Sequence, residues 1–197
     1  MKKKIIIVGA GGHAESCIDL VENNKIFSIK CLVGLKNERN KILLKKYKVT
    51  HSDNDLKSLS KKIPYALIGI GQIKSSSLRV KLFKKLKKLG FKLPTIISPN
   101  SVVSKHSSIG EGTVVMPGAI IGPNVIIGKN CIINSKALIE HGTIIKDNCH
   151  VATAAIINSG VRVGAQSFIG SNSTIKQSVK LKSFSFVKMN ARIIHNG

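Results

Sequence analysis

Three histidines of the chain stand in segments whose residue types could do chemistry. His141 directly follows Glu140, His150 lies between a cysteine and a valine, and His13 belongs to the run Gly-Ala-Gly-Gly-His-Ala of residues 9–14. A neutral imidazole titrates near pH 7 and can take a proton from a nucleophile as a bond forms. A glycine-rich turn before a helix lets backbone N–H groups approach a phosphate. The sequence therefore offers a candidate general base and a candidate phosphate-binding turn.

A repeat over the second half of the chain must position His141 and His150. Seventeen aliphatic residues follow one another at steps of six, without an insertion, from Ile97 to Ile193. A compact side chain lies two residues before each following aliphatic position, so both point to the same side of a short strand. A strict period of six does not fit an α-helix, which repeats every 3.6 residues. Each step is therefore expected to form one flat side of a coil, and three sides close a turn.

The expected corners of the coil carry a second signal. Asn or Gly occupies ten of the sixteen positions that lie midway between two successive aliphatic residues of the series. These residue types tolerate the positive φ that a sharp corner between strands demands. The pattern resembles that of the hexapeptide-repeat proteins, whose left-handed parallel β-helices are usually homotrimeric acyltransferases. The resemblance covers about residues 96–197, and we expect a left-handed β-helix acyltransferase domain over residues 95–197.

The first 94 residues are expected to form a small α/β domain. Residues 4–24 indicate a buried strand, the glycine turn and a helix; further strands are expected over 28–33 and 65–71, and a second helix over 75–89. The dinucleotide-binding pattern also requires an acidic residue at the end of the second strand, where Val33 and Gly34 stand instead. We therefore predict a Rossmann-like parallel sheet of three or four strands that binds a mononucleotide rather than NAD.

The charge of the chain is strongly positive, with a formal net value of +23. Residues 1–94 hold 22 of the 32 basic side chains and six acidic ones, mostly as lysines on expected helices. We interpret these lysines as solvated helix faces rather than a nucleic-acid surface, although a positive field also suits nucleotide or CoA substrates. The apolar run from Ile5 to Ala10 is too short for a bilayer span or a signal peptide, so a cytoplasmic location without membrane insertion is expected.

The four cysteines have no CxxC spacing, and a cytoplasmic chain has little reason to pair them. We interpret them as small buried apolar residues. They are Cys17, Cys31, Cys131 and Cys149.

The two halves together resemble one family of enzymes. A Gly-Ala-Gly-Gly-His turn near the start, a short α/β unit, and hexapeptide coils with residues 139–141 and 149–151 are similar to the sialic acid O-acetyltransferases and to the N-acetyltransferases of UDP-linked 4-amino-sugars, as in bacillosamine synthesis. The resemblance implies a homotrimeric acetyltransferase of bacterial surface glycan biosynthesis. It uses acetyl-CoA as acetyl donor and no metal, and it acts on an amino group of a nucleotide-linked 4-amino-sugar.

The resemblance also assigns roles to individual residues. His141 matches the general base of the family. The positions that match nucleotide contacts are Gly11, Gly12, His13 and Gly71. The positions that match acetyl-CoA contacts are His150, Ser171 through its backbone, and Met189.

The chain departs from the family pattern at three places. An acidic pair usually ends the second strand, an acidic residue usually follows the general base, and a Gly-rich stretch usually lies in the last turn. The residues found at these places are Val33 with Gly34, Gly142, and Lys188-Met189-Asn190.

Other functions remain as alternatives at this stage. The enzyme could acetylate a sugar hydroxyl, as the sialic acid enzymes do, or the coil could be a non-enzymatic scaffold. γ-Class carbonic anhydrases share the coil, and His106, His141 and His150 are the candidate zinc ligands for such a lyase. The final pair of histidines five apart that those enzymes show is missing. The positive charge leaves nucleic-acid binding as a further alternative.

Overall fold

A computed structural model describes residues 2–196 of the chain. These residues form two compact units. The front unit consists of the residues up to Gly71 together with Leu78–Pro94, and the coil unit consists of Gln72–Ser77 together with the chain from Thr95 onward. We call the segment Gln72–Ser77 the strap, because it leaves the front unit and packs with the coil. Among residues 2–196, no helix is both long and apolar enough to cross a bilayer.

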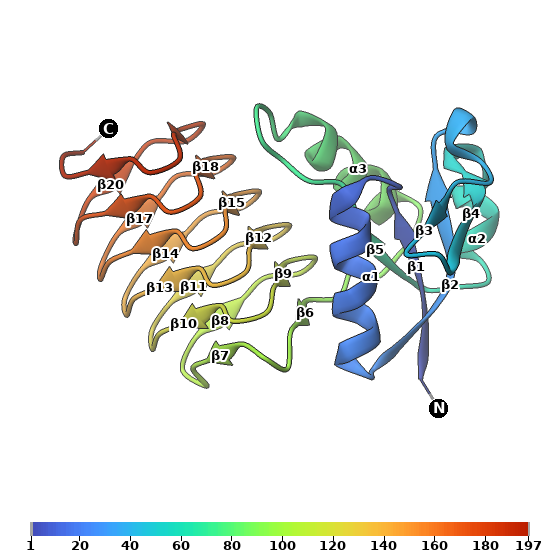
Figure 1. The fold of residues 1–197 in the computed structure, drawn as a ribbon, viewed down its shortest axis with the longest axis horizontal. Helices are drawn as coiled ribbons and strands as arrows, with labels where there is room; N and C mark the ends of the chain where they lie inside the picture. The colour runs from blue at the N-terminus through green and yellow to red at the C-terminus, as the bar shows by residue number, and fades with distance from the viewer. Residues whose placement is uncertain (1, 197) are drawn as a thin grey trace. The chain divides into compact units, whose positions relative to one another are not determined.

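The front unit is a five-stranded sheet with the strand order β3-β4-β2-β1-β5 (Figure 1). All neighbouring strands run parallel except β3, which is antiparallel to β4. The elements are β1 (Lys3–Val8), α1 (Gly12–Asn24), β2 (Phe27–Gly34), the 3₁₀ turn η1 (Lys36–Glu38), β3 (Ile42–Leu43), β4 (Tyr47–Ser52), η2 (Asp53–Asp55), α2 (Leu56–Ser60), β5 (Tyr65–Ile68) and α3 (Ser77–Lys88).

The central strand explains why this sheet forms. Ile5, Ile6 and Ile7 are completely buried, as expected of a parallel strand covered on both faces. One face carries Ile6 and Val8, which pack in a cluster with Leu82 and Leu86 of α3. Helix α1 contributes its own buried stripe, which includes Ala14, Cys17, Ile18, Leu20 and Val21.

The sheet has five strands, where the sequence predicted three or four. The sequence pattern of β3 and β4 is weak, because β3 has two residues and β4 buries only Val49. Their polarity favours a loop when the sequence is taken alone. His51 lies in β4 and pairs with Val33 at the end of β2.

The coil unit confirms the left-handed parallel β-helix. Seventeen two-residue strands, β6 to β22, form three parallel sheets, and each residue pairs with the residue eighteen positions away. The first face holds β6 (Ile96–Ile97), β9 (Val114–Val115), β12 (Ile132–Ile133), β15 (His150–Val151), β18 (Phe168–Ile169) and β21 (Phe186–Val187).

The other two faces follow in chain order. The second face holds β7 (Val102–Val103), β10 (Ile120–Ile121), β13 (Leu138–Ile139), β16 (Ile156–Ile157), β19 (Thr174–Ile175) and β22 (Arg192–Ile193). The third face holds β8 (Ser108–Ile109), β11 (Ile126–Ile127), β14 (Ile144–Ile145), β17 (Arg162–Val163) and β20 (Lys180–Leu181). The turns stack regularly in Figure 1.

The core of the coil contains the residues that the six-residue period selected. The second residue of each strand points inward, and so does the compact residue two positions before it; Ile139, Ala137 and Ile157 are all fully buried. Cys131 and Cys149 occupy the compact position on successive turns, where the Cys149 N–H donates to Cys131 Sγ at 3.4 Å. All four thiols are free, and burial raises the pKa of the Cys17 thiol to about 12.

The corners are left-handed even where Asn and Gly are absent. Every sixth residue from Gly112 to Asn190 has a positive φ, and this series includes Lys136, Ala154, Gln166, Ser178 and Phe184. The interior period therefore imposes this conformation at a cost of roughly 1–2 kcal/mol for each residue that carries a Cβ. The earlier corner at Asn100 is closed differently, since the Asn100 N–H donates to Ser98 Oγ at 3.2 Å.

The substitution Ala154→Gly should stabilise the fold. Ala154 has a φ of 56°, which glycine adopts without the steric cost of a Cβ. We therefore expect the free energy of unfolding to rise by about 1 kcal/mol. Urea unfolding at equal protein concentrations measures this change. The control is Ala155→Gly, which removes a fully buried methyl group next to the corner and should destabilise. Equal losses of stability in the two variants would contradict the assignment of strain to the corner.

Candidate functional site

The glycine turn of the front unit is held between two strand ends. The Gly9 N–H donates to Val33 O at 2.8 Å, which fixes the turn against the end of β2. A Cβ on Gly9 would lie 2.7 Å from the carbonyl oxygen of Gly69, and the φ of Gly9 is +130°. Only glycine combines this φ with this close approach to the end of β5.

The four predicted nucleotide-contact residues lie at one edge of the front unit. Gly11 is the N-cap of α1 and Gly12 its first residue; both are exposed, and a Cβ on either would meet nothing within 4 Å. A Cβ on Gly71 would lie 3.5 Å from the Cβ of the half-buried His13. The structure thus brings Gly11, Gly12, His13 and Gly71 together at the carboxyl ends of β1 and β5, the edge where parallel α/β sheets bind ligands.

A buried arginine holds the loop that carries Gly71. Arg79 of α3 is 1% exposed, and its Nη1 donates to the carbonyl oxygens of Ile68 at 3.0 Å and Ile70 at 2.8 Å. Charge-assisted bonds of this kind are stronger than neutral ones. Arg79 therefore fixes the backbone that leads to Gly71. The edge predicted to bind the nucleotide is held in place without a ligand.

Two charged residues that sequence reasoning missed also lie at this edge. Glu38 of η1 turns back so that its Oε2 accepts the Leu35 N–H at 2.8 Å, just beyond the end of β2. Lys41 Nζ donates to the carbonyl oxygen of Ala10, in the glycine turn, at 2.7 Å. The signal for Glu38 was available, because a glutamate three residues after a turn's first residue can cap it. Lys41 had no comparable signal, since its contact spans 31 residues.

His141 lies at the corner between the second and third faces, which we call the second corner. It is exposed, and within residues 2–196 its ring forms no hydrogen bond, including none with Glu140. The following residue, Gly142, takes the left-handed corner conformation with a φ of 68°. An exposed and unconstrained imidazole is accessible to a substrate, and any group that orients it comes from elsewhere than its own loop.

His150 lies on the outer surface of the first face, but the strap covers it. Its exposed fraction is 7%, and its Nδ1 lies within hydrogen-bonding distance of Gln72 O. Because a carbonyl oxygen only accepts, Nδ1 carries the proton in this bond. Two more bonds fix the strap: Gln72 Nε2 donates to Asn148 O at 3.1 Å and Ser76 Oγ donates to Gln166 Oε1 at 2.8 Å. Nothing in the sequence indicated this cover.

An aromatic column continues upward from His150 on the first face. The rings of His150 and Phe168 meet edge to face with centroids 5.2 Å apart, and those of Phe168 and Phe186 stack at 5.2 Å. The strap and the two phenylalanines of this column line a small open pocket of about 170 Å³, which Phe184 and Gln166 also line.

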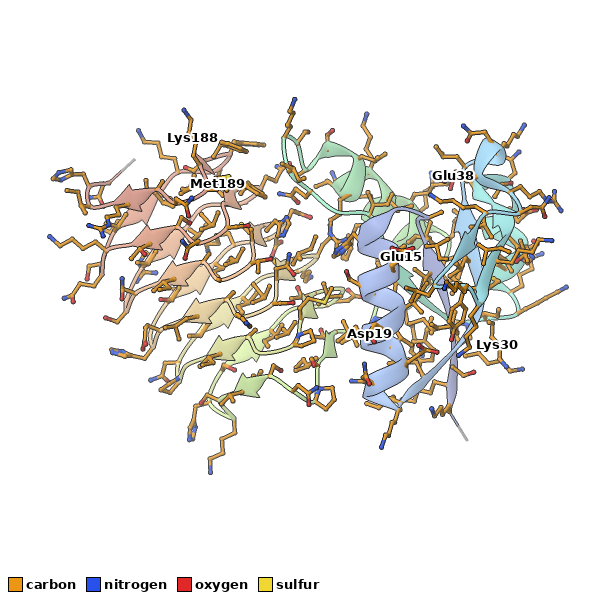
Figure 2. The ribbon with its side chains drawn as sticks, viewed as in Figure 1. Glu15, Asp19, Lys30, Glu38, Lys188 and Met189 are labelled. Carbon is orange, nitrogen blue, oxygen red and sulfur yellow. The ribbon has the colours of Figure 1, made fainter. Side chains whose placement is uncertain are left out.

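Ser171 and Met189 lie on successive turns at the corner between the first and second faces, the first corner. The Asn190 N–H donates to Ser171 O at 2.9 Å, so one turn is stacked on the other. Met189 is 68% exposed, and Figure 2 shows its side chain beside that of Lys188 on the last turns. The structure therefore brings Ser171 and Met189 together on one edge.

A single chain does not bring His141 and His150 together. The second corner, which carries His141, is opposite the first face, which carries His150, in a coil of triangular section. The two residues are nine positions apart, which is half of the eighteen-residue turn. Across residues 2–196, the structure shows no group of three His, Cys, Asp or Glu side chains placed to hold a metal ion.

Each of the two units matches a known protein-family model. The family model described as the PglD N-terminal domain matches residues 4–86, and the one described as the GMPPB C-terminal domain matches residues 92–194. No curated protein matches the chain significantly.

Solved structures match nearly the whole chain. A point mutant of perosamine N-acetyltransferase from Caulobacter crescentus, in complex with CoA and GDP-perosamine, is 26% identical with a TM-score of 0.91, covering 98% of this chain and 89% of that one. The acetyltransferase domain of PglB from Neisseria gonorrhoeae is 24% identical with a TM-score of 0.90, covering 99% and 93%. WeeI from Acinetobacter baumannii is 21% identical with a TM-score of 0.72, covering 96% of each chain.

The fold and the matched models define a hexapeptide-repeat acyltransferase whose front domain is of the type found in enzymes that act on nucleotide sugars. The chain belongs to the PglD-type family of N-acetyltransferases, and it is an acetyltransferase. The resemblance inferred from the sequence is confirmed.

Removing the His150 ring should loosen the strap. His150→Ala leaves Gln72 O without its donor, and a lost bond of this kind costs about 1–3 kcal/mol. We expect trypsin to cleave after the exposed Lys74 about tenfold faster in this variant than in the native chain. Limited proteolysis with mass spectrometry measures the rate. His150→Asn, which keeps a side-chain donor, should restore most of the protection; equal cleavage of the alanine variant and the native chain would contradict this role.

Proposed function

We propose that this chain is a cytoplasmic, acetyl-CoA-dependent N-acetyltransferase that acts on the amino group of a nucleotide-linked 4-amino-sugar in bacterial surface glycan biosynthesis. The observation that carries the proposal is the similarity over 98% of the chain to an enzyme solved with CoA and GDP-perosamine. The open glycine edge of the front unit and the exposed imidazole of His141 are the features that such a reaction needs.

The reaction needs a base because an amine attacks a thioester slowly while it keeps its proton. In the proposed step the sugar nitrogen attacks the acetyl carbonyl carbon, and a C–N bond forms as His141 takes one proton from the nitrogen. The C–S bond then breaks, and the sulfur of CoA leaves with that proton from the imidazolium. The products are the acetamido-sugar and free CoA, so atoms and charges balance without a metal.

The remaining predicted residues take binding roles in this proposal. Gly11 and Gly12 present the N-terminal backbone of α1 to the phosphates, while His13 and Gly71 line the same edge. On the coil, the backbone of Ser171 and the side chain of Met189 would contact CoA along the first corner. His150 would lie near the thioester end, with its orientation set by the Gln72 carbonyl.

A homotrimer completes the proposed site. His141 and His150 lie on opposite sides of one coil, so they act on one acetyl group only if two copies contribute. Apolar residues flank the second corner on both sides: Ile120 is 45% exposed and Ile126 is 49% exposed, and Leu138 and Ile144 lie one turn later beside His141. An unpaired apolar strip of this kind suits burial against a second copy of the chain.

Replacing His141 should abolish acetyl transfer without affecting the fold. His141→Ala should lower kcat/KM by about 10²–10⁴-fold, while the melting temperature and the mass of the assembly stay unchanged because the ring is exposed. Release of free thiol from acetyl-CoA measures turnover against a panel of UDP-, GDP- and dTDP-linked 4-amino-sugars and free sialic acids. Unchanged turnover would rule out His141 as the base. Consumption of sialic acid alone would favour O-acetylation, and no thiol release with any acceptor would favour a scaffold.

Charges placed in the apolar strip should break the assembly. The double variant Ile120→Glu/Ile126→Glu should sediment as a monomer and lose acetyl transfer, because buried unpaired carboxylates oppose association. Ile26→Glu, which alters a residue of the front unit that is 52% exposed, is the matched control and should leave both properties unchanged. A double variant that keeps the native mass would show that this strip is not the interface.

A further inference from the structure

We propose that Glu38 binds the ribose of the nucleotide, so that the chain accepts ribonucleotide-linked sugars and discriminates against 2′-deoxyribonucleotide-linked ones. The inference rests on the proposed function, since it concerns the nucleotide of that substrate. In the related dinucleotide-binding α/β folds, a carboxylate at the end of the second strand accepts a hydrogen bond from the ribose 2′-OH. The sequence has no acid at that place, but the structure supplies one from the next turn.

The carboxylate of Glu38 lies beside the position that a side chain on residue 34 would take. A Cβ built on Gly34 would be 3.0 Å from Glu38 Oε2 and 3.3 Å from the Cβ of Ala10, in the glycine turn. The Cγ1 atom of Val49 would also lie 3.0 Å from that Cβ, so a side chain at position 34 would crowd both Val49 and the Glu38 carboxylate. Gly34 thus leaves open the space at the end of β2 beside which the Glu38 carboxylate lies.

The loop that carries Glu38 is firmly held. The Glu38 N–H donates to Leu35 O at 3.0 Å, and the Lys41 N–H donates to Glu38 O at 3.0 Å. The end of the loop is tied to β4, because the Asn40 N–H donates to Val49 O at 2.9 Å and the Val49 N–H donates to Lys41 O at 2.8 Å. Figure 2 labels the Glu38 side chain on this loop. The carboxylate is therefore preorganised, and a ligand does not bear the cost of ordering it.

The carboxylate keeps capacity for a ligand. Its two oxygens have about four acceptor sites, and the Leu35 N–H occupies one of them on Oε2. A ribose hydroxyl is a donor that can fill another. Hydrogen bonds from hydroxyl groups to a carboxylate are about twice as strong as bonds between neutral groups.

The neighbouring charges match a nucleoside diphosphate. Lys41 Nζ, on the carbonyl of Ala10, brings a positive charge to the glycine turn, where the N-terminus of α1 adds its own partial positive charge. The acidic group thus lies at the end of β2 and the positive groups lie at the turn. A ribonucleoside diphosphate likewise carries hydroxyl donors on its ribose and negative charges on the phosphates attached to it.

The test compares ribonucleotides with their 2′-deoxy forms. Isothermal titration calorimetry of the full chain with GDP and dGDP, and with UDP and dUDP, gives two affinity ratios. We expect the native chain to bind the preferred ribonucleotide at least tenfold more tightly than its deoxy form, and Glu38→Ala to bring that ratio to about one. Glu38→Gln, whose amide oxygen still accepts the Leu35 N–H, separates the loss of the carboxylate from a loss of the loop and should give an intermediate ratio.

Each other outcome has a definite meaning. Asp19→Asn on α1 is the control carboxylate and should keep the native ratio. Equal affinity of the native chain for ribose and deoxyribose forms, or an unchanged ratio in Glu38→Ala, would overturn the role of Glu38 and leave the proposed function standing. If no nucleotide binds and no amino-sugar nucleotide releases thiol from acetyl-CoA, the proposed function and this inference both fail.

Discussion

The hydrogen bonds between successive turns of the coil are the constraint on which the rest of this structure depends. A strand of two residues has no stability alone, so each must pair with the strands eighteen residues before and after it. That pairing works only if every turn returns above the previous one. The corner residues must then turn sharply, and Lys136 and Phe184 accept a left-handed conformation for this reason. The periodic interior determines the backbone even where the local residue type opposes it.

The same constraint decides where chemistry can occur on the coil. Residues eighteen apart share a column, as Ser171 and Met189 do, while residues nine apart lie on opposite sides, as His141 and His150 do. One coil therefore carries His141, the proposed base, on one side and His150, buried under the strap, on the other. In the proposed homotrimer, His141 of one copy would act beside His150 of another, and the apolar strip around the second corner would be buried between them.

In the front unit, small residues leave the backbone N–H groups at the start of α1 accessible. Gly9 lets the turn lie against the end of β5, and Gly11 with Gly12 leaves the start of α1 open. Arg79 fixes the opposite loop from behind. Gly34 leaves room beside the carboxylate of Glu38. The loop after β2 thus brings two charged side chains, Glu38 and Lys41, to an edge that small residues keep open.

The sequence by itself determined the coil, its eighteen-residue turn and its core, because a strict period of six in Ile97 to Ile193 is compatible with one backbone path. It also located the glycine turn and the strands around it, since buried parallel strands such as residues 5–8 are continuous apolar runs. The short polar strands β3 and β4 escaped it because tertiary pairing, not pattern, makes them strands. Only the tertiary structure decided that the strap covers His150, that Glu38 turns back to the end of β2, and that Lys41 reaches the glycine turn. These contacts join residues that no periodicity relates, and they depend on the space that the folded backbone leaves between strand ends.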